Sequence, residues 1–223
     1  MDLSFFKKSF PTIIRIAILF VILVIVGYFL LSPKKRLPIY NPSDVNPRLV
    51  DDSVKHIKYN HKISDFHLIN QNGDTVTQKD YFNKIYVADF FFTSCQTICP
   101  IMTTNMADLQ KYFKNDSAVK FLSHTVTPDI DSVPVLKAYA HKKGVIDGKW
   151  NLVTGDKKQI YNLARKSYFA VLDEGDGGKQ DFIHTEQFVL VDKNKQIRGF
   201  YDGTNKEEIQ QIIEDIQLLK ENE

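Results

Sequence analysis

The residues best suited to chemistry in this chain are its two cysteines, the only two among 223 residues. Cys95 and Cys99 are separated by three residues, and Pro100 follows directly. A cysteine thiolate attacks disulfide bonds and binds soft metal ions such as Cu(I) or Zn. The spacing is wider than the Cys-x-x-Cys that favours disulfide exchange at a tight turn. Disulfide chemistry, metal binding and a plain structural role as small buried side chains all remain open at this point.

The sequence around the cysteines predicts how they are positioned. Residues 85–92 form a continuous apolar run rich in aromatic and β-branched side chains, which is typical of a central strand covered on both faces. Pro100 favours the first turn of a helix, which we expect over residues 101–114. Cys95 then lies in the loop between strand and helix. Because the N-terminus of a helix stabilises negative charge, this setting favours thiolates and disfavours the purely structural role.

A metal site would need more ligands, and the chain has six histidines. His184 directly follows a Gly- and Asp-rich stretch, 171–182, which predicts a loop able to bring the imidazole over the thiols. For His124, at the end of a predicted strand, we expect a hydrogen-bonded structural role. His67 alternates within a strand, and we expect solvated surface positions for His56, His61 and His141. Met102 and Met106 are four residues apart on the predicted helix, where ordinary packing is expected.

The rest of the folded part, which we expect to begin near residue 58, alternates between strands and helices. Residues 63–70 and 75–77 predict a β-hairpin, and further strands are expected at 119–126, 150–153, 184–192 and 196–201. Helices are expected at 131–143, 157–166 and 206–220. This order predicts an α/β fold whose sheet has helices on both faces, parallel first strands and an antiparallel last pair. With the cysteines after the first central strand, it resembles a thioredoxin-like fold with an N-terminal β-hairpin.

Residues 1–32 predict a membrane anchor. The stretch from Ile16 to Ser32 is uncharged, and with residues 10–15 it reaches the roughly 20 residues needed to span a bilayer as a helix. No small-x-small cleavage site follows it, which disfavours a cleaved signal peptide. Residues 33–57 hold four of the eight prolines and predict a tether between this anchor and the domain at 58–223.

Charge and cysteine usage bear on partners and location. The net charge of +2 gives no electrostatic footprint for nucleic acid. Basic residues flank the apolar segment on both sides, so the positive-inside rule does not decide its orientation. An oxidisable cysteine pair beyond a membrane anchor suits an oxidising compartment. We therefore expect the domain outside the cytoplasm.

At this point four sequence features resemble the Sco/SenC family. They are Phe-Phe-Thr-Ser-Cys95-Gln-Thr-Ile-Cys99-Pro100, the stretch from Ser123 to Tyr139, Trp150-Asn-Leu-Val-Thr-Gly155, and His184-Thr before a Val-Leu-Val-Asp strand. Members of that family are membrane-anchored, thioredoxin-like copper proteins that help assemble the dinuclear copper centre of cytochrome c oxidase. The resemblance implies that Cys95 and Cys99 bind Cu(I) and that His184 adds the third ligand for Cu(II). It also implies an extracytoplasmic, periplasmic domain whose partner is the copper subunit of the oxidase or another copper protein.

One segment departs from the family pattern. Where the family usually has Ser-Val-Asp-Pro with a later Asp-Thr-Pro, this chain has Thr125-Val-Thr127-Pro128 and then Asp131-Ser-Val133, so Thr127 replaces an acidic residue. The three implied ligands are intact.

Two functions from different classes remain. The first is a copper-binding assembly factor, which is not an enzyme in the turnover sense. The second is a membrane-tethered thiol-disulfide oxidoreductase that acts on protein substrates. Both would use the same cysteines, so His184 is the residue that distinguishes them. A peroxiredoxin is disfavoured because its Pro-x-x-x-Thr-x-x-Cys context is absent.

Overall fold

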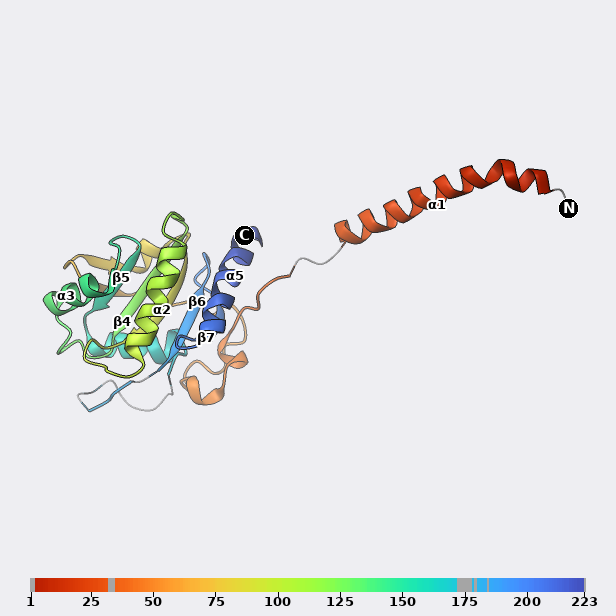
Figure 1. Cartoon of the computed structure of the whole chain (residues 1–223). Helices are drawn as coiled ribbons and strands as arrows, with labels where there is room; N and C mark the ends of the chain where they lie inside the picture. Colours follow the sequence, from red (N-terminus) through yellow and green to blue (C-terminus); the bar gives the residue numbers. More distant parts are fainter. Residues whose placement is uncertain (1–2, 32–34, 172–177, 179, 184, 223) are drawn as a thin grey trace. The chain divides into compact units, whose positions relative to one another are not determined.

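The chain forms two compact units, Met1–Arg36 and Leu37–Glu223. A computed structural model describes residues 3–31, 35–171, 178, 180–183 and 185–222. The first unit contains the 29-residue helix α1 (Leu3–Leu31) (Figure 1). Within these described ranges, no helix combines the length and the apolar character required to cross a membrane. The membrane anchor at residues 1–32 therefore stays a prediction.

The second unit is built on a seven-stranded sheet in the order β2-β1-β5-β4-β3-β6-β7. Strands β3, β4 and β5 are parallel, whereas the hairpin β1–β2 and the pair β6–β7 are antiparallel. The predicted hairpin, parallel centre and antiparallel last pair are confirmed. The strands are β1 (His67–Asn70), β2 (Thr75–Thr77), β3 (Ile85–Phe91), β4 (Val119–Thr125), β5 (Trp150–Thr154), β6 (Gln187–Val191) and β7 (Ile197–Asp202).

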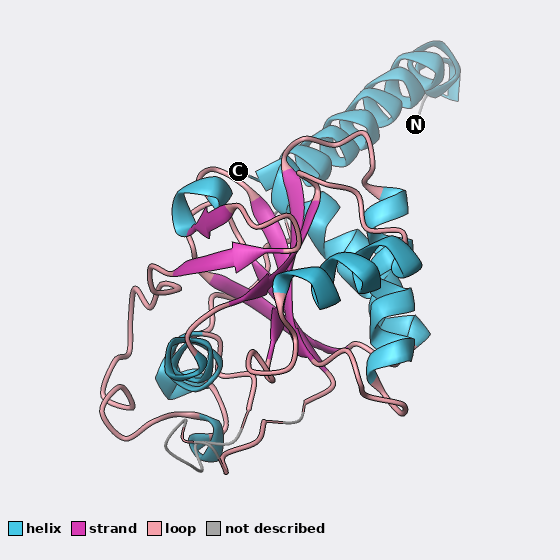
Figure 2. Ribbon diagram, turned by 90° about the vertical axis from the view of Figure 1, so that its left-hand side faces the viewer, coloured by secondary structure: helices cyan, strands magenta, loops and turns pink. Residues whose placement is uncertain are grey.

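Helices cover both faces of the sheet, as predicted (Figure 2). Because side chains of a strand alternate between faces, β3 contributes Val87 to one core cluster and Ala88 to the other. The Val87 face packs against α2 (Cys99–Tyr112), α3 (Val133–Lys143) and α5 (Lys206–Asn222), and the Ala88 face against α4 (Lys157–Asn162) and the π-helical turn that follows it (Leu163–Ser167). Met102 and Met106 are fully buried in the Val87 cluster, which confirms their packing role.

Several element ends differ from the predicted ones. The first strand begins at His67 instead of residue 63, and β6 begins at Gln187 instead of residue 184. At β6 the cause is local: the backbone N–H of Gln187 donates to the hydroxyl of Thr185, so the chain turns there before it joins the sheet.

Residues 37–57, which the sequence assigns to a tether, belong to the second unit and pack against the rest of it. Short 3₁₀ turns at Pro42–Asp44 and Pro47–Leu49 are each preceded by a capping asparagine. The N–H of Tyr40 donates to the carbonyl of Ile197, 2.9 Å away, on the edge strand β7, and Val50 is fully buried. The folded unit therefore begins at Leu37, about twenty residues before the predicted boundary at 58, because the edge of the sheet pairs with this segment.

His61 also differs from the prediction of a surface position. Its side chain is buried, with Nε2 2.8 Å from the carbonyl oxygen of Ser167 and the ring packed against Phe169. Burial lowers the pKa of the imidazole, which the hydrogen bond to Ser167 only partly offsets. His61 is thus a structural histidine.

Candidate metal centre

The two cysteines lie where the central strand passes into helix α2. Strand β3 is buried along its whole length and ends at Phe91. Helix α2 begins at Cys99, with Pro100 in its first turn. N–H groups in the first turn of a helix have no helical partner, so the missing N–H of proline costs no hydrogen bond there. Both cysteines are free thiols. The predicted order of strand, loop and helix start is confirmed, and Cys99 itself belongs to the first turn.

Cys95 is the more acidic of the two thiols. Burial raises its pKa, but hydrogen bonds from the backbone N–H groups of Cys99 and Thr97 and from the Thr97 hydroxyl outweigh this and bring the pKa to about 7. The Thr97 hydroxyl oxygen lies 3.6 Å from the Cys95 sulfur. Cys95 is therefore substantially a thiolate at neutral pH, which is the form that attacks disulfides and binds metal ions.

Cys99 has the opposite electrostatic setting. Its side chain is buried, and burial raises the pKa of its thiol to about 12, assisted by the neighbouring Cys95 sulfur and the carboxyl of Asp89. The Cys95 sulfur is close enough to contribute to that shift, and the Cys99 side chain in turn helps to lower the pKa of Cys95. A soft cation that replaces the Cys99 proton would meet two sulfur ligands, and the donor pair therefore fits Cu(I).

Asp89 is a buried carboxyl on the same face of the sheet as the cysteines. Burial raises its pKa to about 7, and a hydrogen bond from Ser123 opposes that shift. The indole N–H of Trp150 donates to the Ser123 oxygen, 2.8 Å away. Among the described residues, Oδ1 of Asp89 has no hydrogen-bond partner. Asp89 therefore places an acidic group of intermediate proton affinity near Cys99.

A second buried carboxylate, Asp131, holds the loop that leads to the cysteines. It accepts hydrogen bonds from the Thr93 hydroxyl at 2.5 Å and the Thr93 N–H at 3.2 Å. It also accepts from the hydroxyls of Thr125 and, at 3.0 Å, Thr127. Thr127, the residue that departs from the family pattern, is thus a donor to this carboxylate. Sequence reasoning missed Asp131, because its donors come from two separate segments, the loop after β3 and the end of β4 with the residues that follow it.

His184 lies outside the described residues, but its neighbours in the sequence are described. The ring of Phe182 packs edge-on against Phe92, with ring centroids 5.2 Å apart, and Ile183 is buried. Phe92 belongs to the cysteine loop, and its carbonyl accepts the N–H of Cys95 at 3.3 Å. The chain that leads into His184 therefore contacts the loop that carries Cys95.

The other histidines lie away from the thiols. His124 is buried on the opposite face of the sheet, stacked on Phe90, and its Nδ1 donates to the carbonyl of Asp89, 3.2 Å away. Burial lowers its pKa to about 4, so it is neutral at pH 7. The structural role expected for His124 is confirmed. His67 and His141 are exposed.

Over the residues with described positions, no group of three or more His, Cys, Asp or Glu side chains could hold a metal ion. That finding does not include His184. The described part of the centre is the cysteine pair together with the segments that position it.

Comparison with known proteins decides the family. The SCO1/SenC family model matches residues 54–221. The chain belongs to the SCO1/SenC family. The SCO1 protein homolog of Bacillus subtilis is 33% identical over 159 residues, which cover 70% of this chain and 82% of the homolog.

Solved structures of SCO1/SenC relatives share the fold. BsSco, described as a member of the Sco family of cytochrome c oxidase assembly proteins with a disulfide switch, is 32% identical with a TM-score of 0.61, covering 72% of this chain and 94% of that one. Yeast Sco1 with copper bound matches with a TM-score of 0.55 over 71% of this chain and 90% of its own. At 22% identity the yeast likeness shows the fold alone. The central sheet with helices on both faces is thus the thioredoxin-like fold of Sco proteins.

Proposed function

We propose that this chain binds copper through Cys95, Cys99 and His184 and supplies it to the dinuclear copper site of a cytochrome c oxidase or to another copper protein. The observation that carries the proposal is the pair of free thiols, Cys95 in the loop before α2 and Cys99 in its first turn, with Phe182 of the His184 segment packed on the cysteine loop. Membership of a family that includes cytochrome c oxidase assembly proteins and a copper-bound relative supports it.

The chemistry follows from the donor set. Two thiolates suit Cu(I), and a neutral imidazole added to them suits Cu(II). The cysteines must be reduced before loading, since a disulfide offers no thiolate. The low pKa of Cys95 supplies the first sulfur ligand at neutral pH, and Cys99 loses its proton as the ion binds. An ion held by so few protein ligands can be passed to a recipient with more.

A second candidate function is the reduction of a disulfide on a partner protein. It is favoured by the unequal thiols, one with a pKa of about 7 and one of about 12. The Cys95 thiolate would attack the partner disulfide, and one partner sulfur would leave. Cys99, after losing its proton, would then attack the mixed disulfide and release the second partner thiol. The partner gains two electrons, one proton from Cys99 and a second from water, and Cys95 and Cys99 become a disulfide.

His184→Ala separates the two functions. We expect Cu(II) affinity of the full-length chain to fall about tenfold or more, because one ligand is lost, whereas the rate of thiol-disulfide exchange with a small disulfide stays the same. Metal titration and an exchange assay on the same preparation measure both. Equal Cu(II) affinity in variant and parent would refute the assignment of His184 as a ligand.

We propose further that residues 1–32 anchor the chain in a membrane and that the folded unit lies on the extracytoplasmic side. Support comes from the uncharged stretch between Ile16 and Ser32 and from the oxidisable pair of cysteines.

A further inference from the structure

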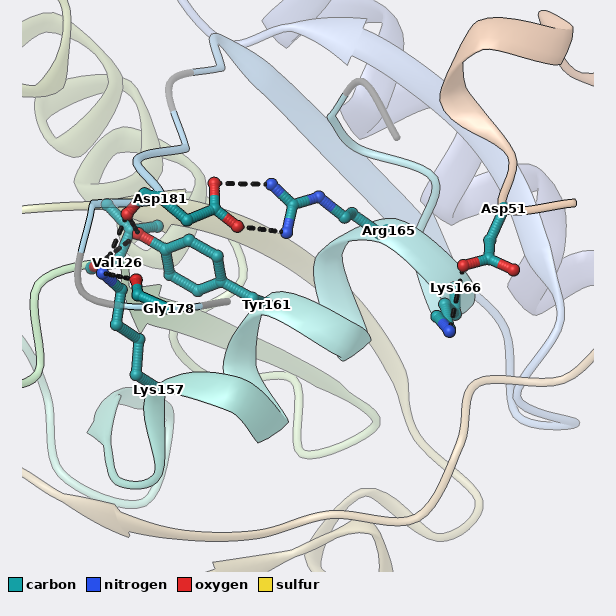
Figure 3. A network of polar contacts seen from close by, with 8 residues as sticks. All are labelled: Asp51, Val126, Lys157, Tyr161, Arg165, Lys166, Gly178 and Asp181. Atoms are coloured by element: carbon teal, nitrogen blue, oxygen red, sulfur yellow. Dashed lines mark hydrogen bonds and ion pairs between the residues drawn. The ribbon is translucent and has the colours of Figure 1, made fainter. Parts of the chain in front are cut away.

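Polar side chains of α4 and the turn after it hold the chain that leads to His184 (Figure 3). Arg165 forms two parallel hydrogen bonds with the carboxylate of Asp181, Nη1 to Oδ2 at 2.6 Å and Nη2 to Oδ1 at 2.8 Å. Both side chains are only 6% exposed. Lys157 donates from Nζ to the carbonyls of Gly178 and Asp181, both 2.8 Å away. Charge and hydrogen bonds thus fix this segment to α4.

Tyr161 connects the same segment to the loop that follows β4. Its hydroxyl lies 2.9 Å from the carbonyl oxygen of Val126 and 3.1 Å from that of Asp181 (Figure 3). Val126 is followed by Thr127, whose hydroxyl donates to Asp131. Asp131 in turn holds Thr93, two residues before Cys95. Hydrogen bonds on either side of the Val126–Thr127 peptide bond therefore link Asp181 to the loop that carries the thiols.

The chain is held on both sides of His184. Before it, Asp181 is bound by Arg165 and Phe182 packs on Phe92. After it, the Thr185 hydroxyl donates to the carbonyl of Ala170, 2.8 Å away. Asp181 precedes His184 by only three residues, and Thr185 follows it directly. The described chain is therefore anchored within three residues before position 184 and one residue after it.

Stability alone does not account for the Arg165–Asp181 pair. Taking two charges out of water costs about as much as their attraction returns, so a buried pair is weak evidence for stability. The planar guanidinium does fix the orientation of its partner, because its two parallel N–H groups donate to both oxygens of a carboxylate in one geometry. The contacts therefore point to a geometric role.

We propose that Arg165, acting through Asp181 and assisted by Tyr161, is a positioning residue that presents the third copper ligand to the two thiols. The inference rests on the proposed function, since it takes His184 as that ligand. Arg165 would affect binding of Cu(II), which uses the imidazole, and leave Cu(I), which the two thiolates hold, unaffected. No described contact joins Arg165 to either cysteine.

The test compares two double variants of the full-length chain, each of which neutralises both members of a buried Arg–Asp pair and so leaves no unpaired buried charge. The first is Arg165→Met with Asp181→Asn. The matched control is Arg198→Met with Asp192→Asn, a pair 2.8 Å apart whose side chains are 11% and 0% exposed. The control pair flanks the turn between β6 and β7, whereas Thr185 lies just before the other end of β6.

We expect the Arg165/Asp181 variant to bind Cu(II) about tenfold more weakly and Cu(I) within twofold of the parent, as measured by anaerobic titration and by chelator competition. In the metal-free chain, hydrogen exchange at residues 180–183 should become faster. The control variant should retain parental affinity for both ions, even if its thermal stability falls as far as that of the Arg165/Asp181 variant.

Four outcomes would overturn the inference. Unchanged Cu(II) affinity in the Arg165/Asp181 variant, with a clear loss in His184→Ala, would remove the positioning role and leave the proposed function standing. Equal losses for Cu(I) and Cu(II), or the same Cu(II) loss in the control variant, would show a general structural effect. Unchanged Cu(II) affinity in His184→Ala itself would refute the ligand assignment and this inference with it.

Discussion

At the scale of single residues, the chemistry of the centre comes from the difference between its two thiols. Placement after a strand and at a helix start predicted stabilised thiolates for the pair. The pKa of Cys95 is lowered as predicted, whereas that of Cys99, in the first turn of the helix, is raised. The high pKa of Cys99 could not be predicted, because it depends on burial and on the carboxyl of Asp89, ten residues earlier in the chain. Sequence spacing carries no information about either.

This difference predicts how the thiols respond to pH. The pKa of Cys95 is lowered to about 7, so its thiolate fraction, and with it the alkylation rate by iodoacetamide, should rise as pH increases through about 7. Cys99, with a pKa of about 12, should react far more slowly across the whole range. Peptide mapping by mass spectrometry distinguishes the two sites. Equal rates, or a midpoint for Cys95 near 9, would contradict this assignment.

Cys99→Ala provides the matched control for that measurement. The variant keeps the backbone N–H at position 99 but removes the Cys99 side chain, which helps to lower the pKa of Cys95. The midpoint for Cys95 should therefore move to higher pH, while remaining below that of an ordinary thiol.

At the scale of elements, the sequence predicted every strand and helix that carries the centre, with errors at their ends. A buried strand appears in the sequence as a continuous apolar run, and a buried helix face as apolar residues three or four positions apart. Both patterns are local, so both can be predicted from the sequence. The early start of the folded unit at Leu37, the buried position of His61 and the Arg165–Asp181 pair depend on contacts between residues far apart in the sequence. No local pattern marks such partners.

Asp131 joins two of these elements, and its removal should loosen the cysteine loop. In Asp131→Asn the carboxylate that accepts hydrogen bonds from three threonines becomes a neutral amide. The NH₂ group of that amide cannot accept a hydrogen bond. We expect the free energy of unfolding to fall by about 1–3 kcal/mol, with faster hydrogen exchange at residues 92–97. Denaturant unfolding and exchange measured by mass spectrometry test both.

The control for that variant is Asp129→Asn, which makes the same change at an exposed position in the same loop. Its stability should stay within about 0.5 kcal/mol of the parent. Equal effects of the two substitutions would show that the threonine contacts of Asp131 do not hold the loop.

At the scale of the whole molecule, the second unit supplies the centre, and the first bears on where it acts. Cells that express the chain should be reduced and then treated, while intact, with a membrane-impermeant thiol reagent. We expect Cys95 to be labelled, because the folded unit is proposed to lie outside the cytoplasm and this thiol ionises near pH 7. Labelling that requires cell lysis would place the unit on the other side.

The central claim is that two sulfurs and one imidazole of this chain hold copper. The most direct measurement is a Cu(II) titration of the reduced full-length chain beside His184→Ala, with spectroscopy that reports the ligand atoms. We predict one equivalent bound with sulfur and nitrogen ligation in the parent, and a lost nitrogen ligand with weaker binding in the variant. Copper bound without sulfur, or an identical spectrum and affinity in both proteins, would contradict the account.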